Sequence, residues 1–458
     1  MKKSTTSHDR RNFLKQSSTV AAGIALGTNL SSPLINPVLG ANDQIRMGFI
    51  GVGNRGTQLL NRFKANPDVK VVALCDVYEP YRTRDMSQIS ERVKASGRIP
   101  KLAPLDGNIR QYNDFRVLLE QKDIDAVCIA TPDHWHAIQT IAAMDAGKDV
   151  YVEKPLTITL KEGRAMVNAQ NKSGRIAAVG LNRRGSRMYQ DLAVAVQNDL
   201  IGKVSFARAC RISNMYPNGI GKLGPEGAPS NLDWDMWLGP RAFRPFQYNI
   251  APYYFRWWSD YSSQMGNWGV HYMDVIRWML GETAPSAITA HGTNQMVDDD
   301  RDIPDTMQVT FEFDSGTIIS FGIYEAGSGG GIMGGEVELN GTKGTLIANQ
   351  KSYQIKPSSP GQFQTWKKLM EPKNPALTAA EDSTANLIRN FLDCVKSRNE
   401  PLCTLEDGHR STSFAHLANI ALKVGQRIEW DAEKEVITNV KEANELLHYP
   451  YRSPWKLS

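Results

Sequence analysis

The 458-residue sequence is poor in cysteine, has no long apolar run and shows no strong excess of charge of one sign. Its cysteines form no CxxC pair and are odd in number, which argues against a disulfide framework and a zinc knuckle. They are Cys75, Cys128, Cys210, Cys394 and Cys403. No run of about 18 or more apolar residues occurs, so we expect no membrane span in the mature protein. A hydrophobic content of 41% excludes a disordered chain.

The net charge of +5 comes almost entirely from the first 40 residues. That segment carries one acid, Asp9, and the basic residues Lys2, Lys3, Arg10, Arg11 and Lys15. Because the rest of the chain is close to neutral, we infer no nucleic-acid partner from its charge.

A pair of arginines opens an export-signal pattern at the N-terminus. Arg10-Arg11-Asn12-Phe13-Leu14-Lys15 precedes a weakly apolar stretch, residues 20–30, and small residues near position 41. This order is typical of a twin-arginine signal, predicted over 1–41, with a basic amphipathic helix as the alternative. We therefore expect export by the twin-arginine route to the periplasm. This route carries folded proteins, often with a cofactor already bound.

Residues 42–180 alternate between apolar strands and helices, which is typical of an α/β domain built on a doubly wound parallel sheet. Strands are predicted at 45–51, 69–75, 124–130, 149–153 and 176–180, and helices at 56–66, 136–146 and 161–172.

Residues 181–458 have a different pattern, in which runs of period two and turn signals predict an antiparallel sheet. Helices are expected at 188–198 and 271–280, an aromatic insertion at 213–265, and two closing helices within 384–424, before an irregular tail. Strands are predicted at 204–211, 287–292, 307–313, 317–323, 335–339, 345–348 and 353–356.

A GxGxxG pattern, Gly51-Val52-Gly53-Asn54-Arg55-Gly56, lies between the first predicted strand and helix. Glycines let the backbone approach a pyrophosphate, and the helix N-terminus offers free N–H groups. Asp76 lies 20 residues past Gly56, at the end of the next strand. A carboxylate there accepts hydrogen bonds from a ribose diol and repels a 2′-phosphate, so NAD is predicted in preference to NADP. The predicted contacts are Gly51, Gly53, Asn54, Arg55, Gly56 and Asp76.

The turn Thr131-Pro132-Asp133-His134-Trp135-His136 directly follows a buried strand, where doubly wound sheets bind ligands. Two histidines raise the question of a metal site, but no third ligand lies nearby in the sequence. We therefore predict no metal. The predicted cofactor contacts are Thr131, Pro132, His134 and His136, with helix capping as the alternative.

Two segments hold the candidate acid–base groups. Glu153-Lys154-Pro155 ends a predicted strand. A lysine near a bound nicotinamide polarises a carbonyl or helps to deprotonate a hydroxyl, although a surface ion pair is the simpler alternative. Asn267 and His271 are four residues apart and so share one face of a helix. Histidine suits general base work near neutral pH, with a structural role as the alternative.

Taken in order along the chain, the glycine run, "ATPDHWH", "EKP" and "GVHYMD" resemble the Gfo/Idh/MocA oxidoreductase family over about residues 45–455. The resemblance implies a Rossmann domain, then a C-terminal α+β domain with a large, mostly antiparallel open sheet. It also implies a homo-oligomer and the oxidation or reduction of sugars or cyclitols with NAD or NADP. Segments 232–240 and 451–455 look like the exported branch.

The resemblance also implies roles for single residues. Lys154, next to the cofactor contact Glu153, would assist proton transfer, and His271 would lie near the reacting hydroxyl. The acid of the family's D-x-x-x-H motif falls at Asn267, whose amide cannot take a proton. Asn182 and Arg183 sit where the family places polar residues near the cofactor or substrate.

The expected function is an exported oxidoreductase that transfers a hydride from a ring hydroxyl carbon of a carbohydrate to tightly held NAD. Arg256 is a candidate hydroxyl or carboxylate clamp, and Trp258 a candidate stacking platform. The alternative is an NAD-dependent glycosidase or lyase, which oxidises the sugar transiently and shows no net redox change. A non-catalytic binding protein is a third possibility, against which Lys154 and His271 both argue.

Overall fold

The computed structural model describes residues 44–457 except 96, 102–104, 106, 330, 332–334 and 375–380. Every described residue belongs to one compact unit, Asp43–Ser458. The predicted export signal, residues 1–41, lies outside the described residues. Among the described helices, none has both the length and the apolar character needed to cross a membrane.

The first sheet has six strands in the order β3-β2-β1-β4-β5-β6, and every pair is parallel. The strands are β1 (Ile45–Ile50), β2 (Val69–Cys75), β3 (Arg110–Tyr112), β4 (Ala126–Ile129), β5 (Asp149–Val152) and β6 (Ala177–Val179). The connecting helices include α1 (Asn54–Lys64), α2 (Glu79–Thr83), α3 (Glu91–Ala95), α4 (Phe115–Leu119), α5 (His136–Asp145) and α6 (Leu160–Ser173). The predicted doubly wound parallel sheet is confirmed, and its strand order reverses between β1 and β4.

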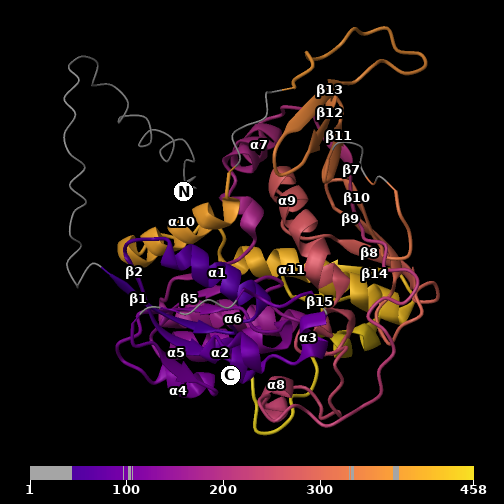
Figure 1. Ribbon diagram of the computed structural model, residues 1–458. Helices are drawn as coiled ribbons and strands as arrows, with labels where there is room; N and C mark the ends of the chain where they lie inside the picture. Colours follow the sequence, from indigo (N-terminus) through magenta and orange to yellow (C-terminus); the bar gives the residue numbers. More distant parts are fainter. Residues whose placement is uncertain are drawn as a thin grey trace, which may run out of the picture. The chain divides into compact units, whose positions relative to one another are not determined.

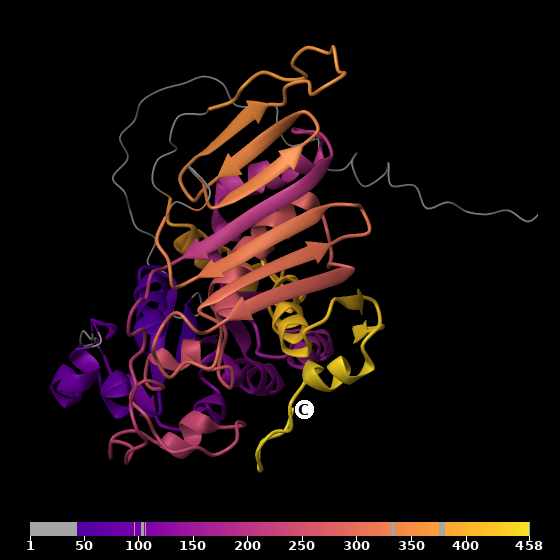
Figure 2. The same ribbon diagram turned by 90° about the vertical axis from the view of Figure 1, so that its right-hand side faces the viewer.

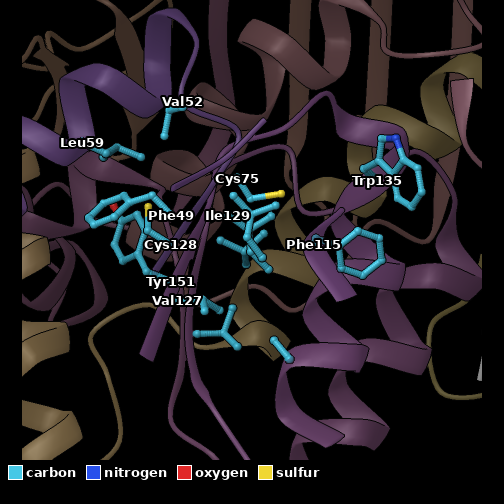
Figure 3. Packing of buried hydrophobic residues seen from close by; sticks show 14 of the residues in the cluster. Phe49, Val52, Leu59, Cys75, Phe115, Val127, Cys128, Ile129, Trp135 and Tyr151 are labelled. Carbon is cyan, nitrogen blue, oxygen red and sulfur yellow. The ribbon is translucent and has the colours of Figure 1, made fainter. Parts of the chain in front are cut away.

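The central strands of this sheet are buried on both faces, which explains their nearly continuous apolar sequences. Figure 3 shows Phe49 and Tyr151 on one side of the sheet and Phe115 on the other. The ring of Phe63, from α1, packs edge-on against Phe49 and Tyr151 at centroid distances of 5.7 and 5.5 Å. This packing holds α1 against the sheet and so positions the glycine turn before it.

The second sheet has nine strands in the order β13-β12-β11-β7-β10-β9-β8-β14-β15, antiparallel except for the pair of β7 and β10. These strands are β7 (Val204–Ile212), β8 (Ala287–Thr293), β9 (Thr306–Glu312), β10 (Ile318–Tyr324), β11 (Val337–Gly341), β12 (Gly344–Ala348), β13 (Tyr353–Pro357), β14 (Ile428–Asp431) and β15 (Val436–Ile437). The large, mostly antiparallel sheet is confirmed.

Helices cover one face of the second sheet, and Figure 2 shows the other face without helices over it. The covering helices are α7 (Arg187–Gln197), α9 (Val270–Leu280) and α11 (Leu405–Val424). Burial alternates along β9, as expected for a sheet with one covered face. Strands β14 and β15 lie in the tail that the sequence analysis expected to be irregular, and this expectation was wrong.

Two segments from the second half of the chain pack on the first sheet. Helix α10 (Ser383–Ser397) lies beside α1 (Figure 1), where Phe391 meets Phe63 and Tyr151 and where Arg389 pairs with Asp68 at 2.8 Å. The aromatic insertion, which contains α8 (Trp234–Leu238) and the short turn η5 (Tyr254–Trp257), joins the same apolar core. The second half of the chain therefore packs over the first sheet and forms one wall of the cavity described below.

Candidate active site

The glycine turn after β1 has the shape of a pyrophosphate cradle. Gly51 has φ +81°, and a Cβ there would lie 2.6 Å from the backbone nitrogen of Thr131. A Cβ on Gly56 would lie 1.9 Å from the carbonyl oxygen of Gly51. Helix α1 starts at this turn with no capping side chain and no acid in its first turn. Its free N–H groups therefore form a site for an anion, which fits a dinucleotide pyrophosphate.

Asp76 follows β2 and lies beside this turn. Its two carboxylate oxygens accept hydrogen bonds from the backbone nitrogens of Val52, at 2.8 Å, and Tyr78, at 2.9 Å. Burial raises the pKa of Asp76 to about 6, and these two hydrogen bonds oppose the rise. The carboxylate is thus largely ionised at neutral pH, held in a fixed orientation and open on the cavity side, as a ribose diol would require.

A cavity of about 890 Å³ extends from this turn to the second domain. It lies at the carboxyl ends of β1 and β4, where the strand order reverses, which is the usual ligand position in such sheets. Most of the residues predicted for the site line it. They are Gly51, Gly53, Asn54, Arg55, Asp76, Thr131, Pro132, Glu153, Lys154, Asn182, Arg256, Asn267 and His271.

Lys154 lies near the middle of this cavity, directly after β5. Its ammonium donates to the carbonyl oxygen of Asn267 at 2.8 Å and to the side-chain oxygen of Asn267 at 3.1 Å. Withdrawal from water lowers the pKa of Lys154 to about 8, although the carboxylates of Glu153 and Asp133 act in the opposite direction. A lysine in this state exchanges a proton near neutral pH, which is what an acid–base group needs.

Asn267 and His271 come from one continuous helical segment. The π-helical turn η6 (Met265–Gly269) runs directly into α9, so the two residues lie on the same side and both line the cavity. Nδ1 of His271 is buried and has no hydrogen-bond partner within the described structure. Burial, together with the cations Arg183 and Lys154, holds the pKa of His271 well below its usual range. His271 is therefore a neutral imidazole with an unused nitrogen.

A second unpartnered polar atom belongs to Asn182, another residue that lines the cavity. The side-chain oxygen of Asn182 is buried, and no hydrogen-bond partner is found for it among the described residues. Buried polar groups in proteins are nearly always paired, so such atoms in a cavity point to a ligand that completes them. Glu153, the residue before Lys154, is already paired with Arg55 at 2.7 Å.

Four of the predicted side chains do not line the cavity. His134 is buried, packs against aromatic rings, has a pKa lowered to about 3 by burial, and bonds the carbonyl of Trp237. The ring nitrogens of His136 lie 2.8 and 3.0 Å from two backbone carbonyls. Arg183 pairs with Glu336 at 3.0 Å. Trp258 donates to a backbone carbonyl in the core of the insertion.

The contacts predicted for His134, His136, Arg183 and Trp258 therefore stay predictions that the cavity lining does not support. The prediction followed residue type and sequence position, whereas each of these side chains turns towards a backbone carbonyl or, for Arg183, the half-buried carboxylate of Glu336. Gly56 also does not line the cavity, because it serves the close packing of α1 on the turn.

The cavity also contains residues that sequence reasoning missed. Asp133 is buried, accepts a hydrogen bond from Ser262, and has a pKa raised by burial. Glu325 and Arg211 come from the second sheet region and line the wall opposite the glycine turn. One feature of the sequence could have indicated Arg211. It is a charged residue on the face of β7 that carries the buried residues Ala207 and Ala209.

The aromatic insertion closes the cavity beside the carboxylate that follows β2. Its Asp233 donates a backbone hydrogen bond to Val77 at 3.0 Å, and Glu79 donates one to Asn231 at 2.9 Å. The side chain of Asn113 also donates to Asp233 at 2.8 Å. We call this joined segment, residues 231–233 with 77–79, the insertion clasp. It covers the end of the site at which the adenosine of a dinucleotide would bind.

Comparisons with known families agree with this geometry. The NAD-binding Rossmann fold of an oxidoreductase family matches residues 45–181, and the C-terminal α/β domain of the same family matches residues 199–457. The chain belongs to the Gfo/Idh/MocA oxidoreductase family. The matches confirm the predicted family, its fold class and NAD as the cofactor of the Rossmann domain.

Similar proteins include two from Shewanella. Glycosyl hydrolase family 109 protein 1 of Shewanella sp. (strain ANA-3) is 35% identical over 220 residues, and an alpha-N-acetylgalactosaminidase of Shewanella oneidensis is 31% identical over the same length. Each alignment covers 45% of this chain and 46% of the relative. The chain thus spans about half the length of the curated relatives it matches.

Solved structures share the fold at low identity. Levoglucosan dehydrogenase in complex with NADH and levoglucosan aligns with a TM-score of 0.60 at 17% identity, covering 84% of this chain and 99% of that one. Aldose–aldose oxidoreductase from Caulobacter crescentus, complexed with glycerol, aligns with a TM-score of 0.58 at 17% identity and the same coverage. Both support the two-domain Gfo/Idh/MocA architecture.

Proposed function

We propose that this Gfo/Idh/MocA protein oxidises a ring hydroxyl of a sugar or sugar derivative, using an NAD that stays bound through turnover. One observation carries the proposal. The cavity that begins at the glycine cradle also contains Lys154, with its lowered pKa, and the unpartnered polar atoms of His271 and Asn182. A polyhydroxyl ligand is suited to complete such atoms.

The residues present fit the cofactor. The turn from Gly51 to Gly56 and the free N–H groups of α1 would hold the pyrophosphate, and Asp76 would hold the ribose diol. When bound, NAD supplies the redox chemistry by accepting a hydride from the sugar carbon. The protein's own residues supply binding, orientation and movement of the proton.

Lys154 would take the hydroxyl proton in its neutral form, or pass it on from His271. Asn267 orients the ammonium through two oxygen atoms, without a charge that would hold the proton more tightly. His271 is neutral before the reaction, so its free nitrogen accepts the hydrogen bond of a sugar hydroxyl. The acid–base work therefore falls on a lysine and a histidine without the carboxylate of the family motif.

Retention of NAD is supported by the insertion clasp. Its backbone hydrogen bonds cross the end of the cavity at Asp76, and the aromatic residues Trp237, Tyr253 and Tyr254 extend the cover. A cofactor enclosed in this way leaves slowly. An exported enzyme needs that property, because it meets little free NAD. Export by the predicted signal over residues 1–41 remains part of this proposal, as does a homo-oligomer formed through the second sheet.

A second candidate is a redox-neutral glycosidase, favoured by the names of the Shewanella relatives. A ring hydroxyl is oxidised to a ketone, and the neighbouring C–H becomes acidic. Loss of that proton expels the glycosidic oxygen, water then adds to the double bond, and reduction of the ketone restores the sugar. Substrate and product stand at the same oxidation level, so no external electron acceptor is consumed.

The test uses the purified full chain. Mass spectrometry after denaturation should identify bound NAD, and incubation with sugars and glycosides then distinguishes the two reactions. Turnover that requires a second sugar or a dye as acceptor supports the oxidoreductase. Release of sugar without any acceptor supports the glycosidase. Protein that carries no nucleotide, and that neither reduces added NAD nor cleaves any glycoside, would contradict both.

A further inference from the structure

Arg211 is a cation of the site wall that lacks a carboxylate partner in the described structure. In β7 the side chains of Ala207 and Ala209 face the buried helix-covered side, and the two-residue period places Arg211 on that same side at the carboxyl end of the strand. There it lines the cavity. The strand therefore places a charged side chain at its carboxyl end, where the covered face of the sheet meets the cavity.

The guanidinium of Arg211 lies flat on an aromatic surface. Its central carbon is 3.8 Å from the centroid of the Trp268 ring, and that ring lies 6.3 Å from the ring of His271, centroid to centroid. Stacking on the indole fixes the plane of the guanidinium and leaves its edge for hydrogen bonds. Nε of Arg211 is buried, and no partner for it is found among the described residues.

Two other charged groups of the cavity wall, Arg55 and Glu325, already have partners of opposite charge. Arg55 pairs with Glu153 at 2.7 Å. Glu325, the carboxylate of the same wall as Arg211, accepts hydrogen bonds from Trp257 at 2.9 Å and from Arg301 at 2.6 Å. No ion pair joins Arg211 to any acid in the described part of the chain. Its charge is therefore left for a ligand, because a buried N–H without a partner is costly.

We propose that Arg211 binds the carboxylate of a uronic acid unit in the substrate, so that the natural substrate is an acidic sugar or its glycoside. A guanidinium edge matches a carboxylate with two parallel hydrogen bonds. The position beside Trp268 and His271 places this contact on the wall next to the proposed reacting hydroxyl. This inference rests on the proposed function, since it names the class of sugar that the same cavity accepts.

The experiment compares binding of matched acidic and neutral sugars to the NAD-loaded protein by isothermal titration calorimetry. The probes are the methyl glycosides of glucuronic and galacturonic acid, the corresponding glucosides and galactosides, and glucose 6-phosphate. We expect at least one uronide to bind tenfold or more tightly than its neutral counterpart. In Arg211→Met the uronide and its neutral counterpart should bind about equally. Arg211→Lys should retain part of the preference, because lysine supplies the charge without the two parallel N–H donors of a guanidinium.

Arg208→Met is the matched control. Arg208 lies on the same strand but on the opposite face, where it pairs with Glu338 at 3.0 Å. Its removal should leave the preference unchanged. Equal NAD content and equal unfolding midpoints in all variants would show that they fold. Uronide preference that persists in Arg211→Met, a wild-type protein that binds no uronide, or tighter binding of glucose 6-phosphate would each overturn the proposal.

Failure of the proposed function has a different signature. The absorbance of the bound nicotinamide at single turnover reports ring oxidation, whereas calorimetry reports the carboxylate contact. A uronide preference lost in Arg211→Met, without any reduction of NAD by any sugar, would support the subsite and contradict the oxidation. Reduction of NAD by neutral sugars, with no uronide preference, would support the oxidation and contradict the subsite.

Discussion

The ammonium of Lys154 donates to two oxygen atoms of Asn267, the backbone carbonyl at 2.8 Å and the side-chain amide at 3.1 Å. The family places an acid at the position of Asn267, so this contact joins the proposed base to a neutral residue. A charged partner would hold the lysine protonated, whereas an amide orients it and leaves its pKa low. The pair thereby fixes the direction of the base, while burial lowers its pKa.

Removal of Lys154 should stop turnover and leave the cofactor in place. For Lys154→Met we expect kcat to fall about 10²–10⁴-fold, the usual range for a positioned acid–base group. In the wild type, kcat/KM for sugar oxidation should rise with pH and level off above about 8, because the neutral amine accepts the proton. Steady-state kinetics across pH and the NAD content of the variant test this. A fully active Lys154→Met would remove the assignment.

Asn267→Asp should move the pH profile to higher values. A carboxylate at this position favours the protonated amine, so the pKa of Lys154 rises, by about one unit or more for a charge this close. Asn267→Ala is the paired variant. It removes a hydrogen bond to the charged form and should shift the midpoint the other way. Profiles of kcat/KM that coincide in all three proteins would show that Asn267 does not tune the base.

Asp76→Asn should weaken NAD binding by about 10–100-fold, the value of a hydrogen bond to a charged group. The change removes a charge and keeps the shape, and it should also narrow the preference for NAD over NADP. Because the pKa of Asp76 is raised to about 6, the carboxylate is ionised above that pH, and NAD should leave faster as the pH falls below it. Cofactor release measured by fluorescence from pH 5 to pH 8 decides this. Release that does not depend on pH would argue against the ribose contact.

Gly56→Ala should disrupt the cradle, because its Cβ would lie 1.9 Å from the carbonyl oxygen of Gly51. Overpacking of this kind costs about 1–3 kcal/mol, and we expect a lower unfolding midpoint together with reduced NAD content. Gly227→Ala is the control, since a Cβ there meets nothing within 4 Å. Calorimetric unfolding of both variants is the measurement. Equal stability and NAD content in the two would contradict the described packing of α1.

Asn113→Ala should loosen the insertion clasp, because it removes a 2.8 Å hydrogen bond to Asp233. The loss of about 1 kcal/mol would speed NAD release about fivefold without touching the proposed base. Asn198→Ala, at the exposed end of α7, is the control. Loss of NAD during dialysis, followed by mass spectrometry, compares the two. If NAD leaves both variants at the wild-type rate, the clasp does not retain the cofactor.

The sequence was most informative where neighbouring residues alone decide the structure, as in an apolar strand or a glycine turn. Strand β2 was predicted at its observed bounds, since an apolar run ends in Asp76 and begins after Pro67-Asp68. The glycine turn was equally readable, because only glycine tolerates these backbone contacts. Strands β14 and β15 were missed, since they are only four and two residues long, too short for alternation to stand out, and β14 pairs with β8 across more than a hundred residues.

The sequence by itself determined the Rossmann fold, the cofactor class and the acid–base candidates Lys154 and His271, because glycine spacing, strand alternation and motif order are local properties. Only the tertiary structure decided which polar side chains face the cavity. Arg183 pairs with Glu336 and His134 bonds the carbonyl of Trp237, whereas Arg211, an inconspicuous strand residue, lies beside Trp268. The physical reason is that a polar group in the interior takes the nearest partner the fold offers, and that partner lies far away in the sequence.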